Sequence, residues 1–135
     1  MLEGINPLLT GEILLHLDRM GHSDAVVIAD AHFPAWALGA PVIDLPGTSS
    51  PHVLAAVRTV LPLDDEPAMD LMASADGSTL LVHQDLMSAA GVIQPRFVDR
   101  HEFYELSTSA RVILRTGETR QYGNALMRKG LVIGP

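Results

Sequence analysis

Two histidines and two aspartates lie close together in the first quarter of this sequence. His22 and Asp24 stand before a short apolar run, residues 25–29, and Asp30 and His32 follow it. Imidazole and carboxylate groups transfer protons readily near neutral pH, and a buried strand would hold them on rigid backbone. We therefore expect acid–base chemistry on a small ligand that lies between these groups.

The same residues also have plain structural interpretations. Asp30 could cap the turn that Pro34 marks, and His22 could be a surface residue after Gly21 ends a helix. A metal site made of His22, Asp30 and His32 is conceivable, but the spacing matches no closed zinc pattern. The sequence also lacks a phosphate-binding loop, a dinucleotide fingerprint, a zinc-protease motif and a serine nucleophile elbow. We therefore predict neither a metal nor a cofactor.

Three polar residues farther along the chain extend this set. Arg100 stands at the start of an expected helix, and Tyr122 and Asn124 lie in a polar loop. A sugar needs several donors and acceptors at fixed positions, because a buried polar group left unpaired costs about 1–3 kcal/mol. Taken singly, Arg100 could pair with nearby acids, Tyr122 could bury its ring, and Asn124 could shape a turn after Gly123. As a set they suit a polyhydroxylated ligand.

Composition narrows the class of protein. The 135 residues suit one domain, residues 1–135, and the absence of cysteine excludes disulfides and thiolate nucleophiles. A net charge of −7 without a basic stripe disfavours a nucleic-acid partner. No apolar run approaches the roughly 20 residues of a membrane span, and no signal peptide is recognisable, so we expect a soluble cytoplasmic protein. The 47% hydrophobic content predicts a homo-oligomer that covers apolar surface.

The pattern of apolar residues predicts strands that alternate with helices. Thr10 reads as the N-cap of a helix over residues 11–20 that Gly21 ends, and Ser50 as the N-cap of a second helix with Pro51 at its first position. That second helix presents an apolar face of Val53, Leu54, Val57, Val60 and Leu61. Strands are expected over residues 25–29, 42–45, 68–73, 96–98, 111–115 and 125–127, and further helices over residues 79–90 and after the capping box of Asp99 and Glu102. The continuous run 25–29 favours a strand buried on both faces, so we predict a layered α/β fold with a mainly parallel or mixed sheet covered by helices.

Several short motifs in a fixed order resemble a known family. They are Gly21-His22-x-Asp24, Asp30-Ala31-His32-Phe33-Pro34, Thr116-Gly117-Glu118, Tyr122-Gly123-Asn124 and Lys129-Gly130. The chain is similar over nearly its whole length to the L-fucose mutarotase branch of the ribose pyranase/fucose mutarotase family. Arg100 stands where the resemblance expects an arginine in the fucose branch and a histidine in the ribose branch.

The resemblance implies a cofactor-free isomerase that interconverts the α and β anomers of a monosaccharide, most closely L-fucose. It implies His22 as the proton donor, with His32 in a supporting role. The residues that it implies for substrate binding are Asp30, Arg100, Tyr122, Gly123 and Asn124. It also implies a ring-like decamer with sites near subunit contacts.

Two departures from the family leave alternatives open. Residues 76–95 look shorter than the family's helical segment, and Gln121 stands where the family has a basic residue. Both features bear on which sugar fits, because pocket walls set the accepted hydroxyl pattern. The alternatives are a pyranose–furanose isomerase of the D-ribose pyranase type and a non-catalytic sugar-binding or transport-accessory protein.

Overall fold

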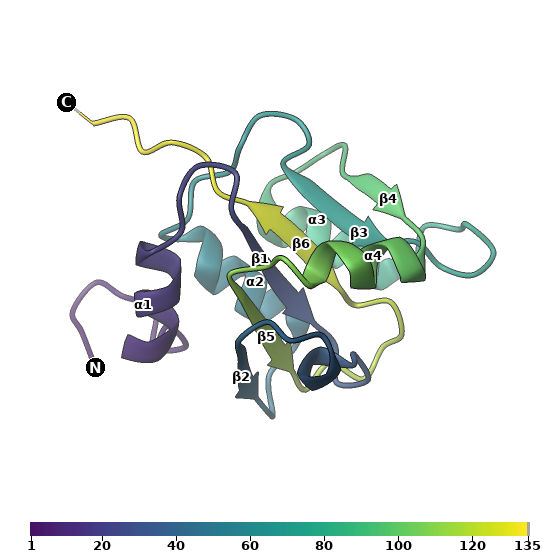
Figure 1. The fold of residues 1–135 in the computed structure, drawn as a ribbon, viewed down its shortest axis with the longest axis horizontal. Coiled ribbons are helices and arrows are strands. Elements are labelled where there is room, and N and C mark those ends of the chain that lie inside the picture. The colour runs from purple at the N-terminus through teal and green to yellow at the C-terminus, as the bar shows by residue number, and fades with distance from the viewer. Residues whose placement is uncertain (135) are drawn as a thin grey trace.

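A six-stranded mixed sheet forms the centre of the computed structural model, which describes residues 1–134 (Figure 1). Its strands are β1 (Ala25–Ala29), β2 (Val42–Leu45), β3 (Met69–Met72), β4 (Arg96–Val98), β5 (Val112–Thr116) and β6 (Ala125–Arg128), in the order β2-β5-β1-β6-β3-β4. The pairs β1 with β5, β2 with β5 and β3 with β4 are parallel, whereas β6 runs antiparallel to both of its neighbours. The predicted α/β fold with a mixed sheet is confirmed.

Helices cover both faces of this sheet. They are α1 (Gly11–Asp18), α2 (Ser50–Arg58), α3 (Leu81–Ala90) and α4 (Arg100–Ser107), with a short 3-10 turn, η1 (Ala35–Ala37). In Figure 1, α2 and α3 lie behind the sheet, while α4 and η1 lie in front of it. Within residues 1–134, no helix is both long enough and apolar enough to cross a bilayer.

Strand β1 shows why its sequence is apolar throughout. Val26 and Ile28 belong to the core under α1, α2 and α3, whereas Val27 and Ala29 face the second core, with Phe103 of α4. Alternate side chains of a strand point to opposite faces, so a strand covered on both sides has no polar face. The strand predicted over residues 25–29 is therefore confirmed with the same first and last residues.

Local capping signals were good guides at two helices. The Thr10 hydroxyl accepts a hydrogen bond from the Ile13 N–H, and the Asp99 carboxylate accepts one from the Glu102 N–H at 2.9 Å. Both side chains satisfy backbone donors that have no partner within their helix. The N-caps predicted for α1 and α4 are thus confirmed.

The predicted start of α2 is wrong by one residue. Ser49, not Ser50, is the N-cap, and its hydroxyl accepts from the His52 N–H at 3.3 Å. Ser50 is the first helical residue and is fully buried, with its backbone N–H hydrogen-bonded to the Glu118 carboxylate. Two adjacent serines have the same capping chemistry, and the tertiary contact with Glu118 selects between them.

Other boundaries also shift by a residue or two. Helix α1 ends at Asp18, before the predicted Gly21, and the Lys129 ammonium donates to the Met20 carbonyl beyond that end at 2.8 Å. Strand β5 runs one residue later than predicted. Val60 lies beyond the end of α2 and is 39% exposed, so it does not join the buried face of that helix.

Candidate functional site

A cleft of about 300 Å³ opens beyond the carboxyl end of β1. This size is at the lower end of the range for small-molecule pockets. Its lining brings together segments far apart in the sequence: Asp30, His32, Phe33, Met72, Arg100, Tyr104, Gln121, Tyr122 and Asn124. Five of the residues that the sequence predicted for the site, Asp30, His32, Arg100, Tyr122 and Asn124, are therefore gathered around one cavity.

Asp30 is the hydrogen-bonding centre of this cleft. One carboxylate oxygen accepts from the His32 N–H at 3.0 Å, and the other accepts from the Gly123 N–H at 3.2 Å and the Asn124 amide at 3.0 Å. Burial raises the pKa of Asp30 above its ordinary value, although these hydrogen bonds favour the charged form. A carboxylate offers about four acceptor positions, so one remains for a ligand hydroxyl.

Asn124 joins the loop before β6 to the end of β1 through hydrogen bonds. Its amide oxygen accepts from the Asp30 N–H at 2.7 Å, while its amide nitrogen donates to the Asp30 carboxylate and to the Met72 sulfur. Asn124 is 2% exposed. The side chain therefore acts on a ligand mainly by holding Asp30 and the loop in place.

The two residues before Asn124 have unusual backbone requirements. Tyr122 has a φ of 63°, in the left-handed region that non-glycine residues seldom adopt. Gly123 is buried and does not line the cleft. Its N–H donates to the carboxylate of Asp30, which does. A Cβ at Gly123 would lie 2.9 Å from Cγ of Glu118 and 3.1 Å from Oγ of Ser50. The absence of a side chain at Gly123 therefore permits the close packing of this loop against Glu118 and Ser50.

Helix α4 supplies the positive and aromatic wall of the cleft. Arg100, its first residue, is exposed, and no hydrogen bond of its guanidinium is found within residues 1–134. Tyr104 lies one turn later on the same face and packs edge-on against Phe33, with ring centroids 5.4 Å apart. The guanidinium is thus available to a ligand that fills the space between these rings and Asp30.

An ion-pair network supports the loop from behind. Arg120 donates to Glu118 at 2.9 Å and to Asp85 of α3 at 2.7 Å. The hydrogen bonds from Arg120 lower the pKa of the buried Glu118 carboxyl, which therefore stays charged at neutral pH. The network joins the loop that carries Tyr122 to α2 and α3.

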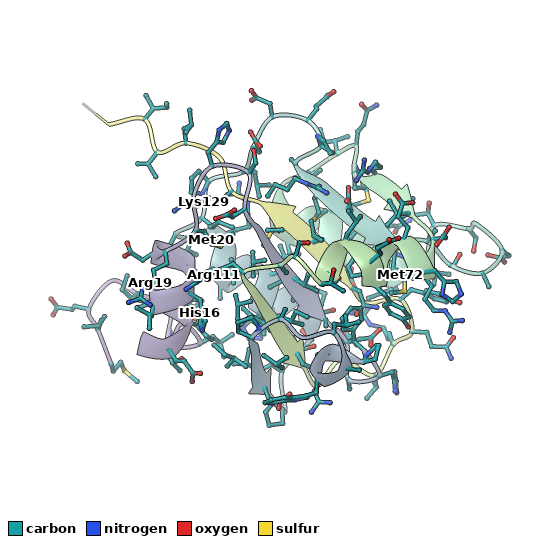
Figure 2. All side chains as sticks on the ribbon, in the orientation of Figure 1. His16, Arg19, Met20, Met72, Arg111 and Lys129 are labelled. Carbon is teal, nitrogen blue, oxygen red and sulfur yellow. The ribbon has the colours of Figure 1, made fainter. Side chains whose placement is uncertain are left out.

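His22 lies at the other end of β1. The five residues of β1 span roughly 16 Å at ~3.3 Å per residue. In Figure 2, Met20 and Lys129 mark the His22 end, and Met72 marks the cleft at the opposite end of the sheet. His22 is 55% exposed, and its Nε2 lies 3.1 Å from Oδ1 of Asp64. A small ligand in the cleft therefore does not contact His22 of the same chain.

The same distance argues against the alternative metal site. His22 is too far from Asp30 and His32 for the three to share an ion within one chain. Among the side chains of residues 1–134, no group of three or more His, Cys, Asp or Glu residues is placed to hold a metal ion.

Three cleft residues were missed by sequence reasoning: Phe33, Met72 and Tyr104, whereas Gln121, expected to bear on which sugar fits, does line the cleft. Tyr104 could have been found, because it stands four residues after Arg100 and shares its helix face. Phe33 is adjacent in sequence to His32, which was selected. Met72 carries no local signal, because only the pairing of β3 with β6 brings it beside Asn124.

Comparisons with known proteins identify the family and the fold. The sequence model of the RbsD / FucU transport protein family matches residues 3–132. The fucose mutarotase of Streptococcus pneumoniae, solved in complex with L-fucose, is 28% identical with a TM-score of 0.87, and the match covers 98% of this chain and 100% of that chain. FucU from Bifidobacterium longum is 31% identical with a TM-score of 0.84, over 96% of this chain and 100% of that chain. Bacillus subtilis RbsD, solved with D-ribose, shares the fold at 23% identity and a TM-score of 0.82, over 98% of this chain and 100% of that chain.

Proposed function

Because this chain belongs to the RbsD / FucU transport protein family, we propose that it is a mutarotase that interconverts the α and β anomers of a monosaccharide, with L-fucose or a close relative as substrate. The cleft is the observation that carries this proposal. It presents the Asp30 carboxylate, the Arg100 guanidinium and the Tyr122 side chain around a space suited to a small molecule. The likeness to a fucose mutarotase solved with L-fucose supports the choice of sugar.

Mutarotation requires two proton transfers. A proton is delivered to the ring oxygen while another leaves the anomeric hydroxyl, the bond between the anomeric carbon and the ring oxygen breaks, and an open-chain aldehyde forms. Rotation about the bond to the aldehyde carbon exposes its other face, and ring closure reverses both proton transfers. Imidazole can donate and accept protons near neutral pH, so His22 is suited to deliver the proton in one direction and recover it in the other.

We assign the sugar to the cleft and His22 to a neighbouring copy of the chain. Within one chain, His22 lies at the far end of β1 and its side chain is largely exposed. An exposed imidazole can enter the cleft of another subunit, and the expected homo-oligomer would supply such a subunit. A ring in which each subunit presents His22 to the next would repeat one heterologous contact around a closed assembly. The decamer implied by the family resemblance is such an assembly.

In this proposal the two ends of β1 have different roles, sugar binding at one end and proton transfer at the other. Asp30 and Arg100 orient the sugar hydroxyls, and Asn124 and Gly123 hold the loop that carries Tyr122. Arg100→Ala should therefore weaken binding first and affect the rate through it, whereas loss of His22 should remove exchange from a sugar that still binds.

Saturation-difference NMR of anomeric protons tests the proposal directly. L-Fucose exchange should accelerate on addition of the protein, without nucleotide, and should be unaffected by a chelator. A panel that includes D-ribose distinguishes the pyranose–furanose isomerase, and binding without exchange for every sugar would identify a sugar-binding protein instead. Loss of activity on metal removal and its return with zinc or manganese would replace the acid–base mechanism by a metal-dependent one.

Mixed assemblies test the shared site. His22→Ala and Arg100→Ala chains, each weakly active alone, should regain about a quarter of the parental activity when refolded together in equal amounts, because intact halves then meet at random. If each site used His22 and Arg100 of the same chain, mixing would restore nothing.

A further inference from the structure

The His22 imidazole is held by a carboxylate that is itself fixed. Oδ1 of Asp64 lies 3.1 Å from Nε2 of His22 and accepts the Asp65 N–H at 2.9 Å, while Oδ2 accepts the Ser23 hydroxyl at 2.6 Å. The hydrogen bond from Ser23 is the largest of the influences that lower the pKa of Asp64, so the carboxylate is charged at neutral pH. Asp64 therefore presents a stationary negative charge to one nitrogen of the ring.

Backbone hydrogen bonds connect the two loops that carry His22 and Asp64. The Lys129 carbonyl accepts the Ser23 N–H at 2.8 Å, and the Lys129 N–H donates to the Asp24 carbonyl at 2.9 Å. On the other side of the same segment, the Asp64 N–H donates to the Arg128 carbonyl at 2.9 Å. Residues 128–130 thus join the His22 loop to the Asp64 loop.

Two local features show how tightly these loops are packed. A Cβ at Gly130 would overlap the Leu63 carbonyl, so only glycine permits the two loops to approach this closely. Ser23 has a φ of 69°, and together with Tyr122 it is one of two non-glycine residues with positive φ within residues 1–134. Such conformations persist where the surrounding contacts enforce them, and they gather at functional sites.

We propose that Asp64 is a positioning residue for His22: it accepts the Nε2 proton and leaves Nδ1 to exchange the proton with the sugar. This inference rests on the proposed function and names the groups that prepare its proton donor. A hydrogen bond to one ring nitrogen fixes the tautomer and the orientation of the ring, and thereby selects which nitrogen meets the ligand. The other charged groups beside the pair are Asp24, whose carboxylate accepts the Gly21 N–H at 2.7 Å, the exposed Asp65, and Lys129.

The ion pair between His22 and Asp64 is expected to contribute little to the free energy of unfolding. Both members are solvent-accessible, with side-chain exposures of 55% for His22 and 22% for Asp64. Exposed ion pairs contribute little to folding, because solvent screens them and ordering two side chains costs entropy. Asp64→Asn should therefore fold as the parent does, and light scattering checks that it assembles equally, so that a change in exchange reflects the orientation of His22.

The first experiment compares Asp64→Asn with Asp65→Asn in the full-length assembled protein, with L-fucose as substrate. Asp64→Asn should lower kcat by about 10–100-fold, as is typical for loss of a group that orients a reacting side chain, and should leave KM within about threefold. Asp65→Asn removes the neighbouring negative charge, and its kcat should stay within about twofold of the parent. Asp64→Glu keeps a negatively charged carboxylate, which Asn lacks, and should recover part of the lost rate.

The second experiment determines the tautomer of the His22 ring without measuring activity. Long-range ¹H–¹⁵N spectra of His22, assigned with His22→Gln, should show the neutral ring protonated at Nε2 in the parent and a mixture of tautomers in Asp64→Asn. An Nδ1-protonated ring in the parent, or a parental kcat in Asp64→Asn when His22→Ala has lost exchange, would overturn the positioning role. If the parent exchanges no sugar, the proposed function fails, whereas this spectrum still decides whether Asp64 sets the tautomer.

Discussion

The two ends of β1 differ in how deeply their polar side chains are buried and in how many hydrogen bonds those side chains make. At the carboxyl end, Asp30 is 3% exposed and accepts three hydrogen bonds from groups of the same chain. At the amino end, His22 is 55% exposed and has one side-chain partner, Asp64. The difference fits the two tasks that we propose: the buried end is ordered within one chain to hold a ligand, and the exposed end carries the imidazole proposed to transfer protons.

This comparison explains why one strand can serve both tasks. Binding needs several groups at fixed positions, and burial fixes them at the cost of access. Proton donation needs one accessible group, and an exposed imidazole can enter a site formed by another copy.

The largest effect is expected at the exposed end. His22→Ala should lower the rate of anomer exchange by about 10²–10⁴-fold, because a positioned acid–base group is removed. Sugar affinity should stay within about tenfold of the parent, since one neutral hydrogen bond contributes only about 0.5–1.5 kcal/mol. NMR exchange measurements and sugar titrations check the two quantities. His52→Ala, an exposed histidine on α2, is the control; exchange at a near-parental rate in His22→Ala would show that His22 is a bystander.

Asn124→Ala should disturb the buried end. It leaves the Asp30 N–H without its partner and removes one of the hydrogen bonds to the Asp30 carboxylate. An unsatisfied buried group costs about 1–3 kcal/mol, so the free energy of unfolding should fall by about that amount and sugar affinity by at least about tenfold. Urea unfolding and sugar titration measure both, with the exposed Gln94→Ala as control. Unchanged affinity would mean that Asp30 and its loop are not part of the sugar site.

Gly123→Ala tests the packing behind Tyr122. The added Cβ would lie 2.9 Å from Cγ of Glu118, so the loop must shift by a few tenths of an ångström. Sugar affinity should fall several-fold, with a loss of stability of about 1–3 kcal/mol that is typical of overpacking. Gly11→Ala is the control, because a Cβ at Gly11 meets open space. Equal behaviour of the two variants in titration and urea unfolding would remove Gly123 from the explanation.

The smallest effect concerns the pH dependence of stability near the cleft. His83 is fully buried; its Nδ1 accepts the Leu80 N–H at 2.9 Å, and its Nε2 lies 2.8 Å from the carbonyl of Met72, a cleft residue. Burial lowers the pKa of His83 below its ordinary value of 6.5, against the opposing hydrogen bond to Met72. Between 6.5 and the lower folded pKa, the unfolded chain binds more protons than the folded chain. The contribution of His83 to stability is therefore complete above the unfolded pKa and is lost as pH falls.

Urea unfolding of the parent and His83→Gln at about pH 7.5 and about pH 5 measures this contribution. The parent should lose more stability between the two conditions than the variant, and His52→Gln should behave as the parent. Asp30, whose pKa is raised, acts in the opposite direction, so the difference between parent and variant is the decisive quantity. An equal loss in both proteins would show that protonation of His83 does not couple to folding.

Elements with strong local signals were predictable from the sequence. Thr10 and Asp99 cap their helices through side-chain hydrogen bonds that span only three residues, and β1 is recognisable because it is apolar throughout. Ser49 and Ser50 show the limit of such signals. Either serine could cap α2, and the contact of Ser50 with Glu118, distant in sequence, makes Ser49 the cap.

The candidate site divides in the same way. Residue type and motif selected Asp30, His32, Arg100, Tyr122 and Asn124, and these residues surround one cleft. Sequence proximity suggested that His22 and Asp30 share a ligand, but an extended strand separates its ends by about 3.3 Å for every residue. Met72 and Asp64 had no local signal, because each reaches its partner through pairing with the distant residues 124–129.

The sequence by itself determined the chemistry available to this protein, because side-chain type decides which groups can move protons or bind hydroxyls. It also determined most helices and strands, since capping and apolar periodicity act over a few residues. Tertiary structure alone decided which of these groups meet: antiparallel β6 brings Asn124 to Asp30 and Lys129 to the His22 loop. Such pairings join residues about a hundred positions apart, and their energy comes from cores and hydrogen bonds that exist only after the sheet has formed.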